Sequence, residues 1–350
     1  MAAALVGAVF VVLAGLALLA WPQARLGPAD DALARVVLPG FAGRVVAVDV
    51  RSADGTRVPV QLRQGRLWPL RKLACGERLT VELTARKPGW AGWLVGHSER
   101  RTLTIETPSA HLLAHGLQVK AGKPVTVAFD TPVSLVSLGG KRPRQLANPR
   151  TVVSLGLVAS GPHSAGAIEV AAAARSWERL PAPAWVSWFP ERPYPQLMTE
   201  PSPGATLAAG GEIVLTFSDS VDQVLGSRRP RLSPATPGHW RLLDPRTLAY
   251  QPDRLGFGFG ANVRVVLPRA VHLAVQAGRK PIRVLRWQVP TGSTLRLQQL
   301  LALLGWLPLR WQASTFLVLT SPKVQLEAAL SPPAGRFVWR YANTPPELQA

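Results

Sequence analysis

One cysteine and one pair of histidines are the side chains best suited to chemistry in this sequence. Cys75 is the only cysteine among the 350 residues and stands directly before a glycine, so the chain forms no intrachain disulfide. Its surroundings favour a small, buried, unreactive residue. His111 and His115 have the spacing that places two zinc ligands on one helical face, but the usual glutamate after the first histidine is missing. We therefore expect no catalytic residue, no metal and no cofactor.

A glycine-rich string at Gly256 to Gly260, Gly-Phe-Gly-Phe-Gly, has a composition that could also cradle a phosphate group. A dinucleotide-binding loop requires a strand before it and a helix after it. Here an alternating, strand-like segment follows the string. The glycines are therefore interpreted as turn formers.

The first residues are apolar enough to cross a membrane. Ala2 to Trp21 carry no charge, and about 20 such residues span the ~30 Å hydrocarbon layer as a helix. A cleaved signal peptide is the alternative, but the run is long, lacks a basic start and shows no clean cleavage site before Pro22. Arg25 and Arg35 follow the helix, which by the positive-inside rule favours a cytoplasmic body. The modules downstream favour a single-pass cell-membrane protein whose body faces the exterior.

Alternation of apolar and polar residues dominates the chain from Val36 onward. Val45 to Val50 and Leu79 to Leu83 alternate with period two, and Asp54-Gly55 is a turn signal. This pattern predicts half-buried strands and therefore a mainly β fold, and the length of 350 residues favours two to four modules. The predicted divisions are an anchor at 1–22, β-sandwiches at 36–107, 108–190 and 191–290, and a short helical module at 291–350.

An internal repeat supports the β interpretation. Ala121 to Val133 aligns without a gap on Ala209 to Val221, and the matched positions are apolar at every second residue. The agreeing positions are Gly122 with Gly210, Val125 with Ile213, Val127 with Leu215, Phe129 with Phe217 and Val133 with Val221. Agreement at these positions indicates core patterning and not a binding motif.

The second copy of the repeat belongs to a longer resemblance. Pro201 to Val221, Leu248 to Pro252 and the final strand at Ile282 to Val289 together resemble bacterial immunoglobulin-like domains. Such domains are β-sandwiches that occur as spacers in surface and secreted proteins. The resemblance covers close to one hundred residues.

After Pro290 the pattern changes to that of a helix. Ser293 or Thr294 can cap it, its leucines recur at i, i+3, i+4 and i+7, and Gly305 closes it. The string LQQLLALLGWLP resembles the opening helix of peptidoglycan-binding repeats, although the later motifs of that family do not occur here. The resemblance implies a glycan-binding helix made of Leu297, Gln298, Leu301, Leu304, Gly305, Trp306, Leu307 and Pro308.

Taken together, the anchor, the sandwiches, this helix and Ala334 to Leu348 resemble the front part of an actinobacterial-type L,D-transpeptidase. The catalytic domain comes last in such proteins and uses a cysteine in an S-x-G-C context, which this chain lacks. The resemblance implies a spacer and peptidoglycan-targeting role, with any transpeptidase domain downstream.

The strong positive charge suggests anionic partners. Lys and Arg number 40 against 20 Asp and Glu, a formal net charge of +20. Such a field attracts polyanions. Basic clusters at Arg100-Arg101, Lys141 to Arg144 and Arg228 to Arg231 are expected to be solvated loops facing anionic wall polymers or membrane headgroups. A membrane-anchored nucleic-acid binder is the alternative, although no recognition helix or stacking-aromatic motif accompanies the clusters.

Overall fold

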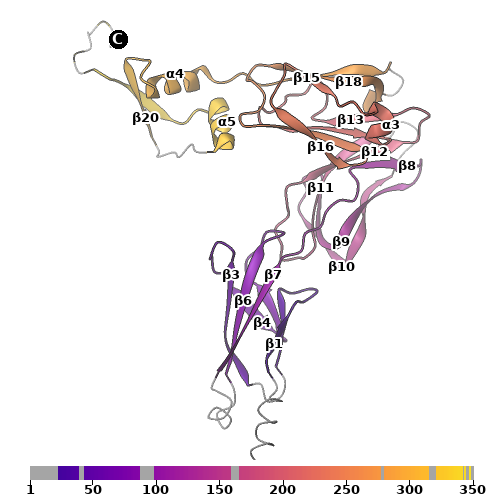
Figure 1. Cartoon of the computed structure of the whole chain (residues 1–350), viewed down its shortest axis with the longest axis vertical. Helices are drawn as coiled ribbons and strands as arrows, with labels where there is room; N and C mark the ends of the chain where they lie inside the picture. The colour runs from indigo at the N-terminus through magenta and orange to yellow at the C-terminus, as the bar shows by residue number, and fades with distance from the viewer. Residues whose placement is uncertain are drawn as a thin grey trace, which may run out of the picture. The chain divides into compact units, whose positions relative to one another are not determined.

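The computed structural model describes residues 23–38, 43–86, 98–158, 165–276, 280–314 and 321–341, with Asn343 and Glu347 (Figure 1). Within these residues the fold is mainly β, as predicted, with a few short helices. The predicted anchor at 1–22 lies outside the described residues. Among the helices that are described, none has the length and apolar character needed to cross a membrane.

The chain divides into two compact units. The first contains residues up to Leu112, Val127–Val153 and Glu169–Ala184; the second contains Leu113–Thr126, Ser154–Ile168 and everything from Trp185. Strands β8 (Gly116–Val119), β9 (Pro124–Leu138), β10 (Arg144–Val158), β11 (Gly166–Ala173) and β12 (Ala184–Pro190) come from the segment predicted as the middle sandwich. Because that segment contributes to both units, the predicted domain boundaries stay predictions.

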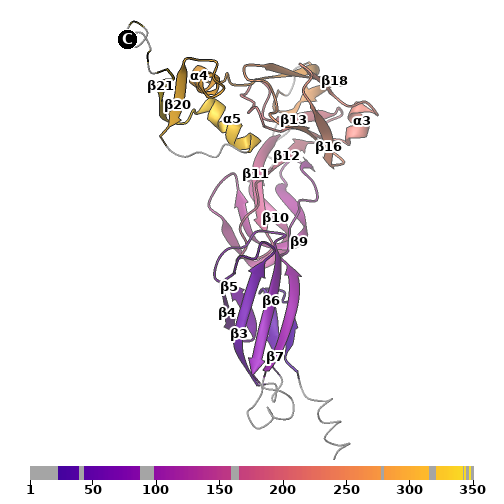
Figure 2. The ribbon, with the colours of Figure 1, turned by 60° about the vertical axis from the view of Figure 1, so that its left-hand side comes forward.

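The first unit begins with two antiparallel sheets that share one core. One sheet has the order β1-β2-β5-β4 and the other β3-β6-β7. Strands β3 to β7 are labelled in Figure 2. The strands are β1 (Arg25–Gly27), β2 (Ala34–Val37), β3 (Arg44–Ser52), β4 (Val60–Arg63), β5 (Arg66–Pro69), β6 (Arg78–Arg86) and β7 (Ser98–Glu106). Val36 and Leu67 of one sheet are buried in the same cluster as Val50 and Val81 of the other. Alternate residues therefore face a common interior, which makes this part a β-sandwich.

The second unit is built around a seven-stranded sheet. Its strand order is β15-β18-β13-β14-β17-β16, with β19 also paired to β18. The elements are β13 (Gln196–Glu200), β14 (Ile213–Phe217), α3 (Val221–Leu225), β15 (Arg231–Ser233), β16 (Gly238–Asp244), β17 (Thr247–Pro252), β18 (Asn262–Leu273), η1 (Ala274–Gln276) and β19 (Ile282–Gln288). The register of β18 shifts between Val266 and Val271. Its first half pairs with β15 and β19, and its end runs parallel to β13, so one strand joins two parts of the sheet.

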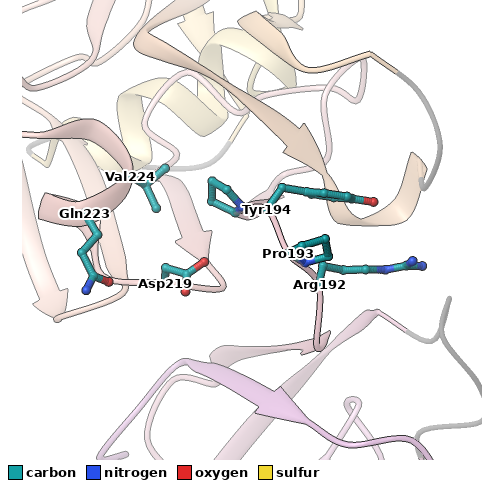
Figure 3. A pocket seen from close by; sticks show the side chains of 7 residues that line it. Arg192, Pro193, Tyr194, Asp219, Gln223 and Val224 are labelled. Atoms are coloured by element: carbon teal, nitrogen blue, oxygen red, sulfur yellow. The ribbon is translucent and has the colours of Figure 1, made fainter.

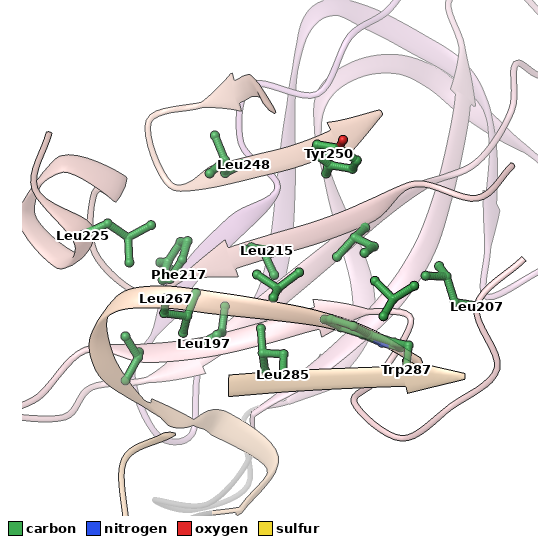
Figure 4. Close-up of a cluster of buried hydrophobic side chains, with 14 of the residues drawn as sticks. Leu197, Leu207, Leu215, Phe217, Leu225, Leu248, Tyr250, Leu267, Leu285 and Trp287 are labelled. Carbon is green, nitrogen blue, oxygen red and sulfur yellow. The ribbon is translucent and has the colours of Figure 1, made fainter. Parts of the chain in front are cut away.

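The core of this unit lies between the strands (Figure 4). Phe217, Leu215 and Leu285 are almost fully buried. Two large aromatic residues at its margin keep their polar atoms satisfied: the Trp287 indole donates to the Pro201 carbonyl at 2.9 Å and the Tyr250 hydroxyl to the Thr236 carbonyl at 2.5 Å. Burial of such residues provides most of the stabilisation, at about 1.5–3 kcal/mol for each large apolar side chain.

A short helical module ends the described chain. It consists of α4 (Thr294–Leu303), β20 (Leu309–Ala313), α5 (Pro322–Leu330) and β21 (Gly335–Trp339), and the two strands pair as a two-stranded antiparallel sheet. The Trp311 ring packs on the Phe337 ring, with centroids 5.0 Å apart. Gly335 faces Trp311 so closely that a β-carbon there would lie 2.4 Å from the indole. The segment predicted as a helical module thus contains two helices and also a two-stranded sheet.

Candidate functional surface of the C-terminal module

Helix α4 ends as the sequence predicted. Gly305 has a φ of +82°, a left-handed conformation that favours glycine. Its amide donates to the Ala302 carbonyl at 3.2 Å, and the Trp306 amide donates to the Leu301 carbonyl at 2.9 Å. This pair of hydrogen bonds is a Schellman motif. At the other end Ser293 occupies the N-cap position, although its side chain forms no capping hydrogen bond.

The buried face of α4 is polar. Arg296, Gln299 and Ala302 are the buried residues of the helix. The Gln299 amide donates to the Pro333 carbonyl at 3.0 Å, and Arg340 donates to the Ala302 carbonyl at 2.7 Å. The Arg340 guanidinium thereby satisfies a carbonyl at the negative end of the helix dipole. Hydrogen bonds to the rest of the module thus fix which side of the helix points inward.

The leucine stripe points outward as a consequence. A stripe with this spacing normally faces a core, yet Leu297 is 56% exposed, Leu304 is 72% exposed and Trp306 beyond the helix is 78% exposed. We call Leu297, Leu300, Leu301, Leu304 and Trp306 the α4 surface. Of the residues predicted as a glycan-binding helix, Leu297, Gln298, Leu304, Gly305, Trp306 and Pro308 are exposed, and Leu301 and Leu307 are half-buried.

This arrangement suits binding and not catalysis. Four leucines and a tryptophan offer apolar contact, and Gln298 on the same helix adds an exposed amide. An apolar cluster in contact with water is the usual mark of an interaction surface. No nucleophile or acid–base pair belongs to the α4 surface.

Two hollows of the second unit add to the candidate surfaces. One, of about 590 Å³, lies between α5 and the Ala208–Gly211 turn, where Leu326 packs against the core of the unit. The other, of about 380 Å³, has Pro193 and Tyr194 on one side and Asp219 and Gln223 on the other (Figure 3). Sequence reasoning missed both, because their walls come from segments distant in the chain and neither contains a motif.

Cys75 is half-buried, where the sequence predicted a buried residue, because it lies in the turn before β6. Its sulfur lies 3.9 Å from a carboxylate oxygen of the buried Glu178 and 3.4 Å from the Arg179 carbonyl. Burial, together with the neighbouring Glu178 carboxylate, raises the pKa of the thiol to about 11. The pKa of Glu178 is itself raised by burial. These surroundings oppose a thiolate and therefore oppose nucleophilic chemistry.

Cys75 should react slowly with a thiol reagent at neutral pH. With a pKa of about 11, roughly one thiol in 10⁴ is ionised at pH 7, so the labelling rate should rise about tenfold per pH unit up to pH 10. The rate is measured with iodoacetamide on the native protein. Glu178→Gln should accelerate labelling because it removes the neighbouring carboxylate. Rapid, pH-independent labelling of the wild type would contradict an inert thiol.

The two histidines do not share a helical face, because no helix spans them. The His111 amide donates to Asp130 at 2.8 Å, and Leu112 forms a β-bridge with Phe129. His115 instead contacts Asp244, with its Nδ1 atom 2.8 Å from the carboxylate. Within the described residues, no group of three or more His, Cys, Asp or Glu side chains is arranged to hold a metal.

No protein-family model matches the chain, and no curated protein matches it. Among solved structures, it is similar to SGBP-B of the Bacteroides ovatus mixed-linkage glucan utilization locus, solved with a mixed-linkage heptasaccharide, at 12% identity and a TM-score of 0.22. That match covers 78% of this chain and 65% of that chain, just under two thirds of its length. The Escherichia coli adhesin FdeC matches at 13% identity and a TM-score of 0.17, covering 76% of this chain and 96% of that one. At these TM-scores the similarities carry no argument about function.

Proposed function

We propose that this chain is a cell-envelope protein that binds peptidoglycan through the α4 surface, with its β units serving as spacers. The observation that carries the proposal is the outward leucine stripe with Trp306 at its end. The resemblance of the same residues to the first helix of peptidoglycan-binding repeats supports it.

The chemistry of peptidoglycan suits such a surface. Sugar rings present C–H faces that pack on an indole, and the attached peptides present methyl groups that pack on leucine. Trp306 is the most exposed of the large apolar side chains that the structure describes. Gln298 supplies a hydrogen-bonding group beside this apolar area, which glycans with their many hydroxyls require.

The location of the protein belongs to the same proposal. An anchor at residues 1–22, immunoglobulin-like spacers and a body on the outside of the cell membrane would bring the α4 surface to the wall. The relation to L,D-transpeptidases is proposed on the sequence resemblance alone. Anionic wall polymers are expected as further partners because of the net charge of +20.

Replacing the most exposed apolar residues of the α4 surface should abolish salt-resistant binding to peptidoglycan. The full chain in an uncharged detergent is sedimented with purified sacculi at 0.15 M and 1 M salt. At 1 M the Debye length is only about 3 Å, so contacts between surface charges are screened while apolar contacts persist. We expect Leu304→Ser with Trp306→Ser to lower the fraction bound at 1 M salt about tenfold.

A matched control tests whether any loss of surface hydrophobicity has the same effect. Leu255 and Phe259 are another exposed aliphatic and aromatic pair, in a turn of the sheet region. Leu255→Ser with Phe259→Ser should leave binding within about twofold of wild type. Equal losses in both variants, or none in the α4 variant, would contradict the proposal. So would a loss of self-association in place of sacculus binding, which would make the α4 surface a contact between two copies.

A further inference from the structure

The outward side of strands β15, β18 and β19 is unusually basic. Leu232, Val265 and Leu285 of these strands lie on its inner side, in contact with the core. Because side chains alternate along a strand, the residues between them face solvent. The outward arginines are Arg231 on β15, Arg264 on β18 and Arg286 on β19, and all three are exposed. We call this side of the sheet the arginine face.

Two of these arginines are placed directly against each other. Arg264 is the cross-strand partner of Arg286, and Arg231 is opposite Val266, two residues further along β18. Like charges directly opposite on neighbouring strands destabilise a sheet. The three strands contain no aspartate or glutamate that could offset the repulsion. An anion bound across the strands would remove it.

A hollow adjoins this face and adds more arginines. It has a volume of about 390 Å³ and is lined by Arg228, Arg229, Arg231, Arg283 and the chain from Val266 to Pro268. The Arg283 side chain is held in place by two backbone carbonyls, since Nε donates to Leu267 at 3.3 Å and Nη2 to Pro268 at 3.1 Å. A guanidinium fixed in this way loses little conformational freedom when it binds an anion.

Little negative charge opposes the cluster. Arg229 lies 3.6 Å from Asp222, which is 82% exposed. Arg264 donates to the Ser233 hydroxyl at 3.4 Å, which leaves its charge unbalanced. Within the residues that the structure describes, Arg231, Arg283 and Arg286 form no salt bridge. The face therefore keeps a concentrated positive charge.

We propose that the arginine face binds an anionic polymer whose repeating units are joined by phosphodiesters and carry no bases. Guanidinium groups pair with phosphate oxygens through two parallel hydrogen bonds, and several in a row favour a polymer over a single ion. The outward positions next to Arg264 and Arg286 on their strands carry no aromatic residue, so bases would have no surface there on which to stack. That the polymer is one of the cell exterior rests on the proposed function.

The test compares two variants with the same loss of charge. Arg264→Gln with Arg286→Gln removes two charges from the arginine face, and Lys141→Gln with Arg142→Gln removes two from an exposed turn elsewhere. Binding of the full chain in an uncharged detergent is measured with poly(glycerol phosphate) from 0.05 to 0.5 M salt. We expect the face variant to bind about tenfold more weakly at 0.15 M salt. The slope of log affinity against log salt concentration should become shallower by about one for each arginine removed. The turn variant should stay within about twofold.

The remaining probes separate the alternatives. Inorganic phosphate should bind far more weakly than the polymer, because single anions engage few arginines at once. Equal losses in both variants would mean that affinity follows net charge, and the proposal would be wrong. Tighter binding of single-stranded DNA, or of phosphatidylglycerol vesicles, at equal phosphate concentration would also overturn it.

Folding and the peptidoglycan proposal are controlled independently. Because Arg286→Gln removes a repulsion, the melting temperature of the face variant should equal or exceed that of wild type. The face variant should retain salt-resistant binding to sacculi, and Leu304→Ser with Trp306→Ser should retain binding to poly(glycerol phosphate). Failure of one proposal is therefore visible while the other holds.

Discussion

Gly256→Ala should unfold much of the second unit, at a cost of about 3–5 kcal/mol. Gly256 has a φ of +71°, and a β-carbon at this position would lie 1.9 Å from the carbonyl oxygen of Ala209. No rotamer relieves that clash, because the backbone fixes the position of the β-carbon and the atom it meets is a backbone oxygen. The next residue, Phe257, is buried in the core and donates its amide to the same Ala209 carbonyl at 2.7 Å. Any shift that admits the methyl group therefore breaks a hydrogen bond and displaces a core aromatic.

The same glycine string supplies the control. Gly258 has open space around the position of a β-carbon and no left-handed φ. Gly258→Ala should change stability by less than about 1 kcal/mol, and in the stabilising direction if anything. Denaturant unfolding followed by tryptophan fluorescence measures both variants, and hydrogen exchange of 207–213 and 255–261 localises the effect. Equal stability of the two variants would show that the turn at Gly256 adapts.

The glycine string also shows what the sequence could predict. Interpretation of its glycines as turn formers is confirmed at Gly256 and Gly260, both of which have positive φ. Period-two alternation predicted strands correctly at Val45 to Val50, now in β3, and at Leu79 to Leu83, now in β6. Alternation succeeds because the burial of one sheet face is a local property of the strand.

The internal repeat predicted the buried positions correctly but not the secondary structure at its end. Its matched residues Val127, Phe129, Leu215 and Phe217 are buried as expected. The two copies diverge at their ends: Val133 continues β9, and Val221 begins helix α3. Ser220 causes the difference, because its side chain and that of Gln223 form a capping box. This signal was present in the sequence, as a serine followed three residues later by glutamine.

The orientation of α4 was not predictable from its own sequence. The leucine spacing correctly predicted a helix ending at Gly305, but the same spacing ordinarily predicts a buried leucine face. Burial here depends on Pro333 and Arg340, which lie more than 30 residues from their partners in the helix. Likewise, the Arg264–Arg286 pairing depends on the strand register of β18 and β19, which sequence alternation alone does not fix. Local patterns predict elements, whereas their exposed faces follow from long-range contacts.

Replacing Asp244 should be the most damaging change of a charged residue in the second unit. The carboxylate accepts three hydrogen bonds: the His115 amide at 2.7 Å, the His115 Nδ1 at 2.8 Å and the Arg246 amide at 2.7 Å. These contacts join the start of β8 to the turn between β16 and β17. In Asp244→Asn, the amide nitrogen would face a donor, so we expect a loss of about 2–4 kcal/mol at pH 7.

The pKa of Asp244 determines how its contribution to stability changes with pH. Burial acts to raise the pKa of Asp244, but the hydrogen bonds from His115 and Arg246 outweigh it and hold the pKa below its ordinary value. A lowered carboxyl pKa contributes stability above about pH 4, and that contribution disappears as the pH falls through the folded-state pKa. The stability difference between wild type and Asp244→Asn should therefore be full at pH 6–7 and shrink below about pH 4.

A second aspartate–histidine pair provides the matched control for Asp244. Asp253 lies 3.8 Å from His239, but its side chain is 52% exposed, against 6% for Asp244. Exposed ion pairs contribute little because water and salt screen them, so Asp253→Asn should cost less than about 0.5 kcal/mol at any pH. Urea unfolding between pH 3 and 7, with hydrogen exchange at the His115 and Arg246 amides, measures both variants. A pH-independent cost for Asp244→Asn would mean that the shape of the Asp244 side chain, and not its charge, holds the start of β8 to the turn between β16 and β17.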